Sequence, residues 1–290
     1  MNAIEYIQTK QQIWAKSQGI NLSKSKGDRG KKIYTSELNE NLFLPINSTV
    51  KQAFSEGDGN ELNQHDGFPA KMQALHSSSA LAVNVFQYWM TKKISMIASA
   101  CGLCKKDNTS PESISFERKF EIDEKFQFSP NIDVVIENSS NFNFKVFAIE
   151  CKFTEPYSHR DPTDSKGLKE KYISLESIWN DIPNIYQLAQ RISPNDNDFD
   201  FFHPAQLIKH ILGLKRKYGK NGFKLLYLWY DTLGGEGLRH KEEIERFIEI
   251  SKKDGVKFQS TSYQELILRL RKGYLDEHSE YTNYLSNRYF

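Results

Sequence analysis

The sequence predicts a mixed α/β fold in which a helix, three strands, a helix and another strand follow one another, with helical additions at both ends. Residues 130–137 and 146–153 are rich in β-branched and aromatic side chains and flank an Asn/Ser-rich loop, which is typical of a β-hairpin. Residues 223–230 form a nearly continuous apolar run, which indicates a central strand covered on both faces. Apolar residues at helical spacing elsewhere predict helices around this sheet.

The chain before the hairpin predicts helices at 3–17 and 70–100 and a strand within 113–128. In the first helix, the residues spaced for a core face are Ile4, Tyr6, Ile7, Ile13 and Trp14. In the second, His76 stands beside three serines, and a polar helix start is favoured over a nucleophile pair because adjacent helical residues do not face each other. In the strand, alternation places Phe116, Arg118, Phe120 and Ile122 on one side and Glu117, Lys119 and Glu121 on the other.

After the hairpin, a polar loop at 154–171 precedes a helix around 185–192 and a second helix from residue 203, with Pro204 in its first turn. Because this helix precedes the apolar run, we expect a crossover connection into the central strand. An amphipathic helix at 239–253, a strand at 256–263, and helices at 264–270 and 280–289 complete the predicted elements.

The length predicts one large domain spanning 1–290, or one core with additions. The net charge is only +2, from 39 basic and 37 acidic residues, so a nucleic-acid surface requires local segregation of charge. Three cysteines are too few for a disulfide framework, and Cys101 and Cys104 lack a second ligand pair for zinc. The longest apolar run, 94–103, is too short to span a membrane. We therefore expect a cytoplasmic protein without a membrane segment.

The hairpin carries the candidate catalytic residues Asp133, Glu150 and Lys152. Strand alternation puts Glu150 and Lys152 on one face, and antiparallel pairing can bring Asp133 across from them. Two close carboxylates repel each other unless a cation lies between them, and Mg²⁺ prefers such oxygen ligands. Lys152 would meet the charge that develops on a scissile phosphate. Glu117 is a further candidate ligand, although a charged outer face of an edge strand explains it equally well.

Two basic segments are candidates for DNA contact. The first is a glycine-containing loop, and the second follows the predicted catalytic strands and contains no acidic residue from 201 to 230. The candidates in these segments are Lys24, Lys26, Arg29, Lys209, Lys215, Arg216 and Lys217. In the polar loop, Tyr157, His159 and Arg160 could also touch DNA. Ordinary solvated surfaces remain the alternative for all of them.

The spacing Asp133…Glu150-x-Lys152, with Pro130 upstream, resembles the PD-(D/E)XK nuclease superfamily. More closely, the chain over about 70–290 is similar to the PGN_0703-like restriction endonucleases of bacteria. The similar segments are Leu75-His76-Ser77-Ser78-Ser79-Ala80-Leu81 with Asn84-Val85-Phe86, Glu150-Cys151-Lys152-Phe153-Thr154-Glu155, His203-Pro204-x-Gln206-Leu207, and Thr261-Ser262-Tyr263-Gln264-Glu265-Leu266. One departure is Asn131, which separates Pro130 from Ile132-Asp133.

The resemblance implies a restriction-endonuclease-like αβββαβ core and a metal-dependent, type II-like DNA endonuclease of the bacterial cytoplasm. It divides the single domain into an N-terminal extension, 1–69, and a catalytic core, 70–290. It implies that Asp133, Glu150 and the backbone carbonyl of Cys151 hold Mg²⁺, for which Mn²⁺ can substitute, and that Lys152 completes the catalytic set. Gln206 and Glu155 are accessory candidates. The implied substrate is double-stranded DNA, cut by a homodimer if the target is palindromic. Two alternatives stay open: a repair or recombination nuclease, and a non-cleaving DNA-binding module on the same fold.

Overall fold

The computed structural model describes residues 1–24, 32–64, 68–158 and 167–290, and its centre is a five-stranded mixed sheet. The strands follow the order β3-β4-β5-β6-β7, in which the first two pairings are antiparallel and the last two are parallel. Their bounds are β3 Pro111–Lys119, β4 Asn131–Asn138, β5 Val146–Lys152, β6 Phe223–Trp229 and β7 Phe258–Ser262. A separate antiparallel pair consists of β1 Leu22–Lys24 and β2 Lys32–Thr35. The predicted mixed α/β class is confirmed.

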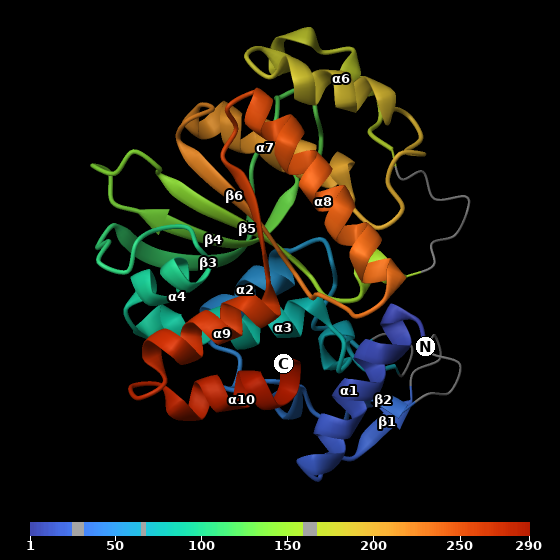
Figure 1. The fold of residues 1–290 in the computed structure, drawn as a ribbon, viewed down its shortest axis with the longest axis vertical. Coiled ribbons are helices and arrows are strands. Elements are labelled where there is room, and N and C mark those ends of the chain that lie inside the picture. Colours follow the sequence, from blue (N-terminus) through green and yellow to red (C-terminus); the bar gives the residue numbers. More distant parts are fainter. Residues whose placement is uncertain (25–31, 65–67, 159–166) are drawn as a thin grey trace.

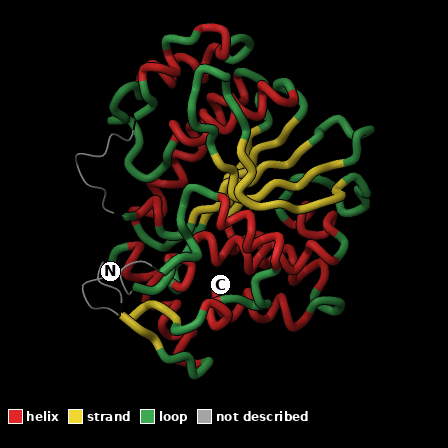
Figure 2. Tube along the Cα trace, turned by 180° about the vertical axis from the view of Figure 1, so that it is seen from behind, coloured by secondary structure: helices red, strands yellow, loops and turns green. Residues whose placement is uncertain are grey.

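Helices cover both faces of the sheet (Figures 1 and 2). On one face lie α3 Ser78–Phe86, α4 Ile94–Ala100 and α9 Tyr263–Tyr274, with α1 Ala3–Ser17 and α10 Ser279–Tyr289 packed outside them. On the other lie α6 Pro183–Arg191, α7 Pro204–Tyr218 and α8 Gly235–Lys253. The remaining helices are short: α2 Ser48–Glu56, α5 Glu170–Ile173, η1 Leu38–Asn41, η2 Lys71–Gln73, η3 Gln87–Thr91, η4 Glu155–Tyr157 and η5 Glu176–Trp179. Within the described residues, no helix is both long and apolar enough to cross a bilayer.

The side chains of β5 alternate between the two layers, as predicted. Phe147, Ile149 and Cys151 pack into the core beneath α3, α4 and α9, whereas Val146 and Ala148 pack into the core beneath α7. Glu150 and Lys152 share the parity of the second set, so they lie on the α7 face. The predicted crossover is also confirmed, because α7 connects β5 to the parallel strand β6.

The predicted helix at 70–100 is wrong in its continuity, since η2, α3, η3 and α4 occupy this segment. Ser77 caps the start of α3 by accepting from the backbone N–H of Ala80, which confirms the polar helix start. At the end of α3, Asn84 accepts from the Phe43 amide and Gln87 accepts from the Asn47 amide. These contacts with a segment about 40 residues away hold the chain in separate turns, and no glycine or proline in the sequence marks the breaks.

Two further predictions of local pattern are wrong. Ile13 is 64% exposed and makes no core face, although Ile7 and Trp14 are buried. The strand expected within 113–128 ends at Lys119, where the chain leaves the sheet. Phe116 packs into one core and Phe120 into the other, so the predicted alternation fails, and the break lies at Glu117 inside β3, which has a φ of 51°.

Candidate active site

A cavity of about 700 Å³ opens where β4 begins and β5 ends. The two strands run antiparallel with Val134 opposite Ile149, so the start of one lies beside the end of the other. The lining combines residues of β3, β4 and β5 with residues of α5 and α7. Asp133, Glu150 and Lys152 all line this cavity, together with the accessory candidates Glu117, Glu155 and Gln206.

Three carboxylates form a row across three neighbouring strands. The register places Phe116 opposite Val134 and Arg118 opposite Ile132, so position 117 faces Asp133. The next pairing places Asp133 across from position 150 by the same reasoning. Glu117 has a φ of 51°, an uncommon value for a non-glycine residue that marks a local distortion of the edge strand beside this row.

The Glu150 carboxylate is fully buried, and both of its oxygens accept hydrogen bonds. Lys152 Nζ donates to Oε1 at 2.6 Å, and His210 Nε2 donates to Oε2 at 2.9 Å. Burial alone would raise the pKa of Glu150, but the positive charge of Lys152 and the contacts with His210 lower it to about 2. Glu150 is therefore ionised at neutral pH.

The pKa values of the other two carboxylates, Asp133 and Glu117, are raised, whereas that of Glu150 is lowered. Burial and the nearby charge of Glu150 raise the pKa of Asp133 well above its ordinary value, although Lys152 opposes the shift. Oδ2 of Asp133 accepts from the Cys151 amide at 2.7 Å. Burial and Glu150 likewise raise the pKa of Glu117 to about 7. Asp133 and Glu117 therefore keep their protons to higher pH than Glu150 does.

Lys152 is held in its charged form. Burial would lower its pKa, but the charges of Glu150, Asp133 and Glu155 outweigh burial and raise that pKa above its ordinary value. Its side chain is only 10% exposed and lies at the same cavity as the acidic row. A lysine in this state can stabilise negative charge but cannot accept a proton near neutral pH.

His210 is a site residue that the sequence analysis missed. Gln206, Lys209 and His210 lie at positions i, i+3 and i+4 of α7, hence on one face, and all three line the cavity. The helical spacing in 203–214 could have indicated this face, but not that β5 lies beneath it. Nδ1 of His210 is buried and has no hydrogen-bond partner among the described residues.

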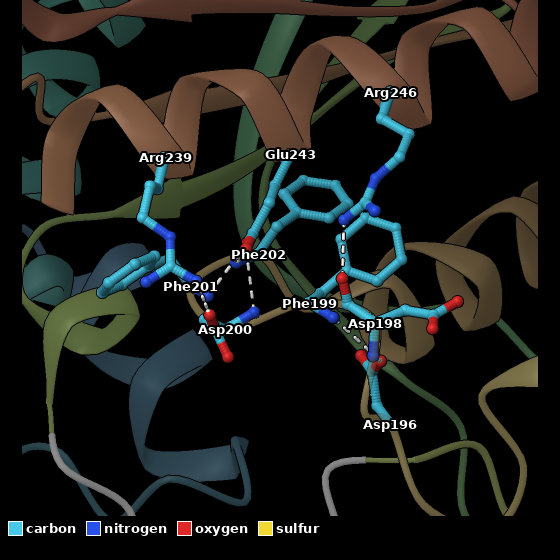
Figure 3. Close-up of polar contacts among 9 residues, drawn as sticks. All are labelled: Asp196, Asp198, Phe199, Asp200, Phe201, Phe202, Arg239, Glu243 and Arg246. Carbon is cyan, nitrogen blue, oxygen red and sulfur yellow. Dashed lines mark hydrogen bonds and ion pairs between the residues drawn. The ribbon is translucent and has the colours of Figure 1, made fainter. Parts of the chain in front are cut away.

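The segment that leads into α7 is clamped by α8. Glu243 of α8 accepts hydrogen bonds from the amides of Asp200, Phe201 and Phe202 at 2.8–2.9 Å (Figure 3). Arg239 pairs with Asp200, and Arg246 donates to the Asp198 carbonyl at 2.6 Å. This clamp fixes where α7 begins, and α7 in turn places His210 against Glu150.

The predicted DNA-contacting residues divide into three groups. Lys209 lines the cavity. Three of the residues lie outside its lining, in the last turn of α7: Lys215, Arg216 and Lys217. Arg216 forms an ion pair with Glu121 at 3.5 Å. Lys24 ends β1, and Lys26, Arg29, His159 and Arg160 lie outside the described residues. Tyr157 is buried and bonded to the Tyr230 carbonyl, so the suggestion that it touches DNA is wrong.

The donor chemistry of the acidic row fits a hard divalent cation. Carboxylate oxygens are the ligands that Mg²⁺ prefers, and a cation would favour the ionised forms of Asp133 and Glu117, whose pKa values are raised by burial and by the charge of Glu150. The described residues do not form a ready-made cluster of three or more His, Cys, Asp or Glu ligands. Lys152 and His210 each donate to one oxygen of Glu150, which leaves a second lone pair on each oxygen for a metal ion.

Cys101 and Cys104 do not belong to this site. Both are free thiols, the first buried and the second half-buried, which agrees with the predicted thiol pair. Burial raises the pKa values of both thiols, so neither is prepared as a thiolate ligand.

A mixed sheet with an antiparallel hairpin, a parallel crossover and charged residues at the strand ends defines a restriction-endonuclease-like α/β core. Residues 8–290 match the family described as "Restriction Endonuclease associating with ARP", and the chain belongs to this family. The membership supports a nuclease-like function. No curated protein and no solved structure matches the chain.

Proposed function

We propose that the protein is a metal-dependent DNA endonuclease of the PD-(D/E)XK type, most similar in role to a type II restriction enzyme. One observation carries this proposal: Asp133, Glu150 and Lys152 converge on one cavity with a third carboxylate, Glu117, beside them. Family membership supports nuclease chemistry, and the substrate would be double-stranded DNA. A homodimer would suit a palindromic target.

Asp133 and Glu150, with Glu117 and the carbonyl of Cys151 as further oxygen donors, would hold Mg²⁺ or Mn²⁺. The bound ion would supply Lewis-acid polarisation of the phosphate and a more acidic water. Lys152 remains protonated and stabilises the negative charge that accumulates on the phosphate as the P–O bond breaks. His210 acts through Glu150 as a positioning residue, because its contact orients that carboxylate. Gln206 and Glu155 line the same cavity and could orient water or substrate.

The test is cleavage of supercoiled plasmid with Mg²⁺ by wild type, Asp133→Asn and Lys152→Ala. We expect nicking or linearisation by wild type and a loss of about 10³-fold or more in both variants, with unchanged far-ultraviolet circular dichroism. Cutting by either folded variant at the wild-type rate would refute the assignment of its residue. Fragment ends at one sequence would favour restriction, and ends set by DNA structure would favour a repair nuclease. Binding without cutting would favour a DNA-binding module.

A further inference from the structure

The cavity lining carries charge of both signs. Its acidic part includes the row Glu117, Asp133 and Glu150. Its basic part comprises Lys152 and three lysines that the catalytic proposal does not use, Lys169, Lys171 and Lys209. Lys169 immediately precedes α5, Lys171 lies within it, and Lys209 lies in the middle of α7. Two separate segments of the chain therefore contribute lysines to the lining of one concavity.

These three lysines act on one another electrostatically. Burial lowers the pKa of Lys209, the charges of Lys169 and Lys171 lower it further, and Glu150 opposes the shift. Lys209 is half-buried, whereas the other two are exposed. Among the described residues, none of the three forms an ion pair with a carboxylate. The three lysines are therefore close to one another and to Glu150, but none of them is directly paired with a carboxylate of the described residues.

One of the exposed lysines is also held in place. The ammonium of Lys171 lies 5.2 Å from the ring centroids of both Phe126 and Tyr172. These rings are themselves in contact, with centroids 4.6 Å apart. Cation–π contact restricts the position of the charge while leaving its outer side open to a ligand. The exposed Lys217 has similar aromatic contacts outside the cavity, so the shared cavity is what distinguishes Lys171.

We propose that Lys169, Lys171 and Lys209 form a phosphate-binding subsite for a second backbone phosphate, next to the one that reacts beside Lys152. This inference rests on the proposed nuclease function. The ligand is a duplex DNA strand with consecutive phosphates, whose second phosphate compensates the lysine charge. Such contacts fix the position of the backbone and do not read sequence. The subsite therefore determines how the strand lies across the acidic row.

The subsite is tested by the salt dependence of DNA binding. Binding of a fluorescently labelled duplex is measured by anisotropy in EDTA, which prevents cleavage, over a series of KCl concentrations. The test variant is Lys169→Gln/Lys171→Gln/Lys209→Gln. The control variant, Lys51→Gln/Lys252→Gln/Lys253→Gln, removes the same charge from exposed positions outside the cavity. Circular dichroism verifies folding, and the exposed pair Lys169→Gln/Lys171→Gln provides the same comparison without altering a half-buried residue.

Each lost phosphate contact reduces the slope of log K against log salt by about 0.9. We expect the test variant to lose about one unit of slope or more relative to wild type, and to bind at least about tenfold more weakly at low salt. Equal slopes for test and control variants, with wild type still binding and cutting DNA, would overturn the subsite and leave the nuclease proposal standing. Absence of both binding and cutting by wild type would overturn the two proposals together.

Discussion

His210 Nε2 on α7 lies 2.9 Å from Oε2 of Glu150 near the end of β5, and this contact joins the crossover helix to the strand that carries the candidate catalytic residues. Lys152 holds the other oxygen, so the carboxylate is oriented from two sides. A residue that orients a metal-binding carboxylate affects metal affinity without touching the metal.

We expect His210→Ala to reduce DNA cleavage about 10–100-fold and to increase the Mg²⁺ concentration needed for half-maximal rate, because Glu150 loses one of its two oriented contacts. His210→Gln retains an N–H donor and should recover part of the loss. Initial rates of plasmid cleavage across a Mg²⁺ titration measure both effects. If His210→Ala required the same Mg²⁺ concentration as wild type for half-maximal rate, this result would contradict the positioning role.

The acidic row should make stability depend on pH in a direction opposite to ordinary acid unfolding. The pKa of Glu117 rises from 4.5 to about 7 on folding, so the folded state holds its proton more tightly than the unfolded state. The resulting stabilisation is fully present below pH 4.5 and is lost as pH rises through about 7. Glu150, whose pKa falls to about 2, loses stabilisation only below its ordinary 4.5 and does not mask this window.

His240, whose pKa is lowered by burial to about 3, makes stability rise with pH over part of this range, so the contribution of Glu117 is taken as the difference in free energy of unfolding between wild type and Glu117→Gln in EDTA. This difference should fall between about pH 5 and pH 7, by about 1.4 kcal/mol for each unit of pKa difference, because the amide of the variant does not titrate. Added Mg²⁺ should reduce this fall, since a bound cation favours the ionised carboxylates. Urea unfolding followed by tryptophan fluorescence measures the effect. The same slope with and without Mg²⁺ would show that the row does not hold the ion.

The contact between α8 and the segment before α7 predicts that removing one side chain, that of Glu243, strongly lowers the free energy of unfolding. Glu243→Ala removes the acceptor of three backbone N–H groups, those of Asp200, Phe201 and Phe202. We expect a loss of about 2–4 kcal/mol in the free energy of unfolding, because these bonds go to a charged, buried carboxylate.

The neighbouring Glu242 is exposed on the same helix and provides the matched control, for which Glu242→Ala should change stability by less than about 0.5 kcal/mol. Glu243→Gln keeps an uncharged acceptor and should fall between the two. Equal effects of Glu243→Ala and Glu242→Ala in urea unfolding would mean that water replaces the carboxylate without cost.

Local sequence pattern was sufficient where the deciding interactions are local. The period of two along β5 correctly separated Glu150 and Lys152 from Ile149 and Cys151. The hairpin then brought Asp133 opposite them, because only a short loop separates β4 from β5. These relationships span few residues, so the sequence constrains them directly.

The remaining features depend on contacts distant in sequence. The change from α3 to η3 in the 70–100 segment lies beside bonds of Asn84 and Gln87 to a segment about 40 residues earlier. The partner of His210 lies 60 residues before it. Lys169 and Lys171 come from a segment without periodicity, and only the folded chain, in which α5 contacts α6, brings them to the cavity. Spacing alone could not indicate any of these relationships.

Helix α7 lies close to the end of β3, and this gives a final prediction: two glycine substitutions should change the free energy of unfolding in opposite directions. Alanine in place of a helical glycine ordinarily stabilises by about 0.5–1 kcal/mol. At Gly213 in α7, however, an added Cβ would lie 2.6 Å from the backbone oxygen of Phe120, which cannot rotate away as a side chain could. Gly273 in α9 has no such neighbour within 4 Å of that position.

We expect Gly213→Ala to lower the free energy of unfolding by about 1–3 kcal/mol, because relieving the overlap displaces α7 from the sheet. Gly273→Ala should raise it by about 0.5–1 kcal/mol. Since α7 also places His210 against Glu150, Gly213→Ala should slow cleavage at temperatures where it remains folded, whereas Gly273→Ala should not. Urea unfolding and plasmid cleavage of the two variants measure these effects. Stabilisation by both substitutions would mean that the close approach of α7 to Phe120 does not constrain the position of the helix.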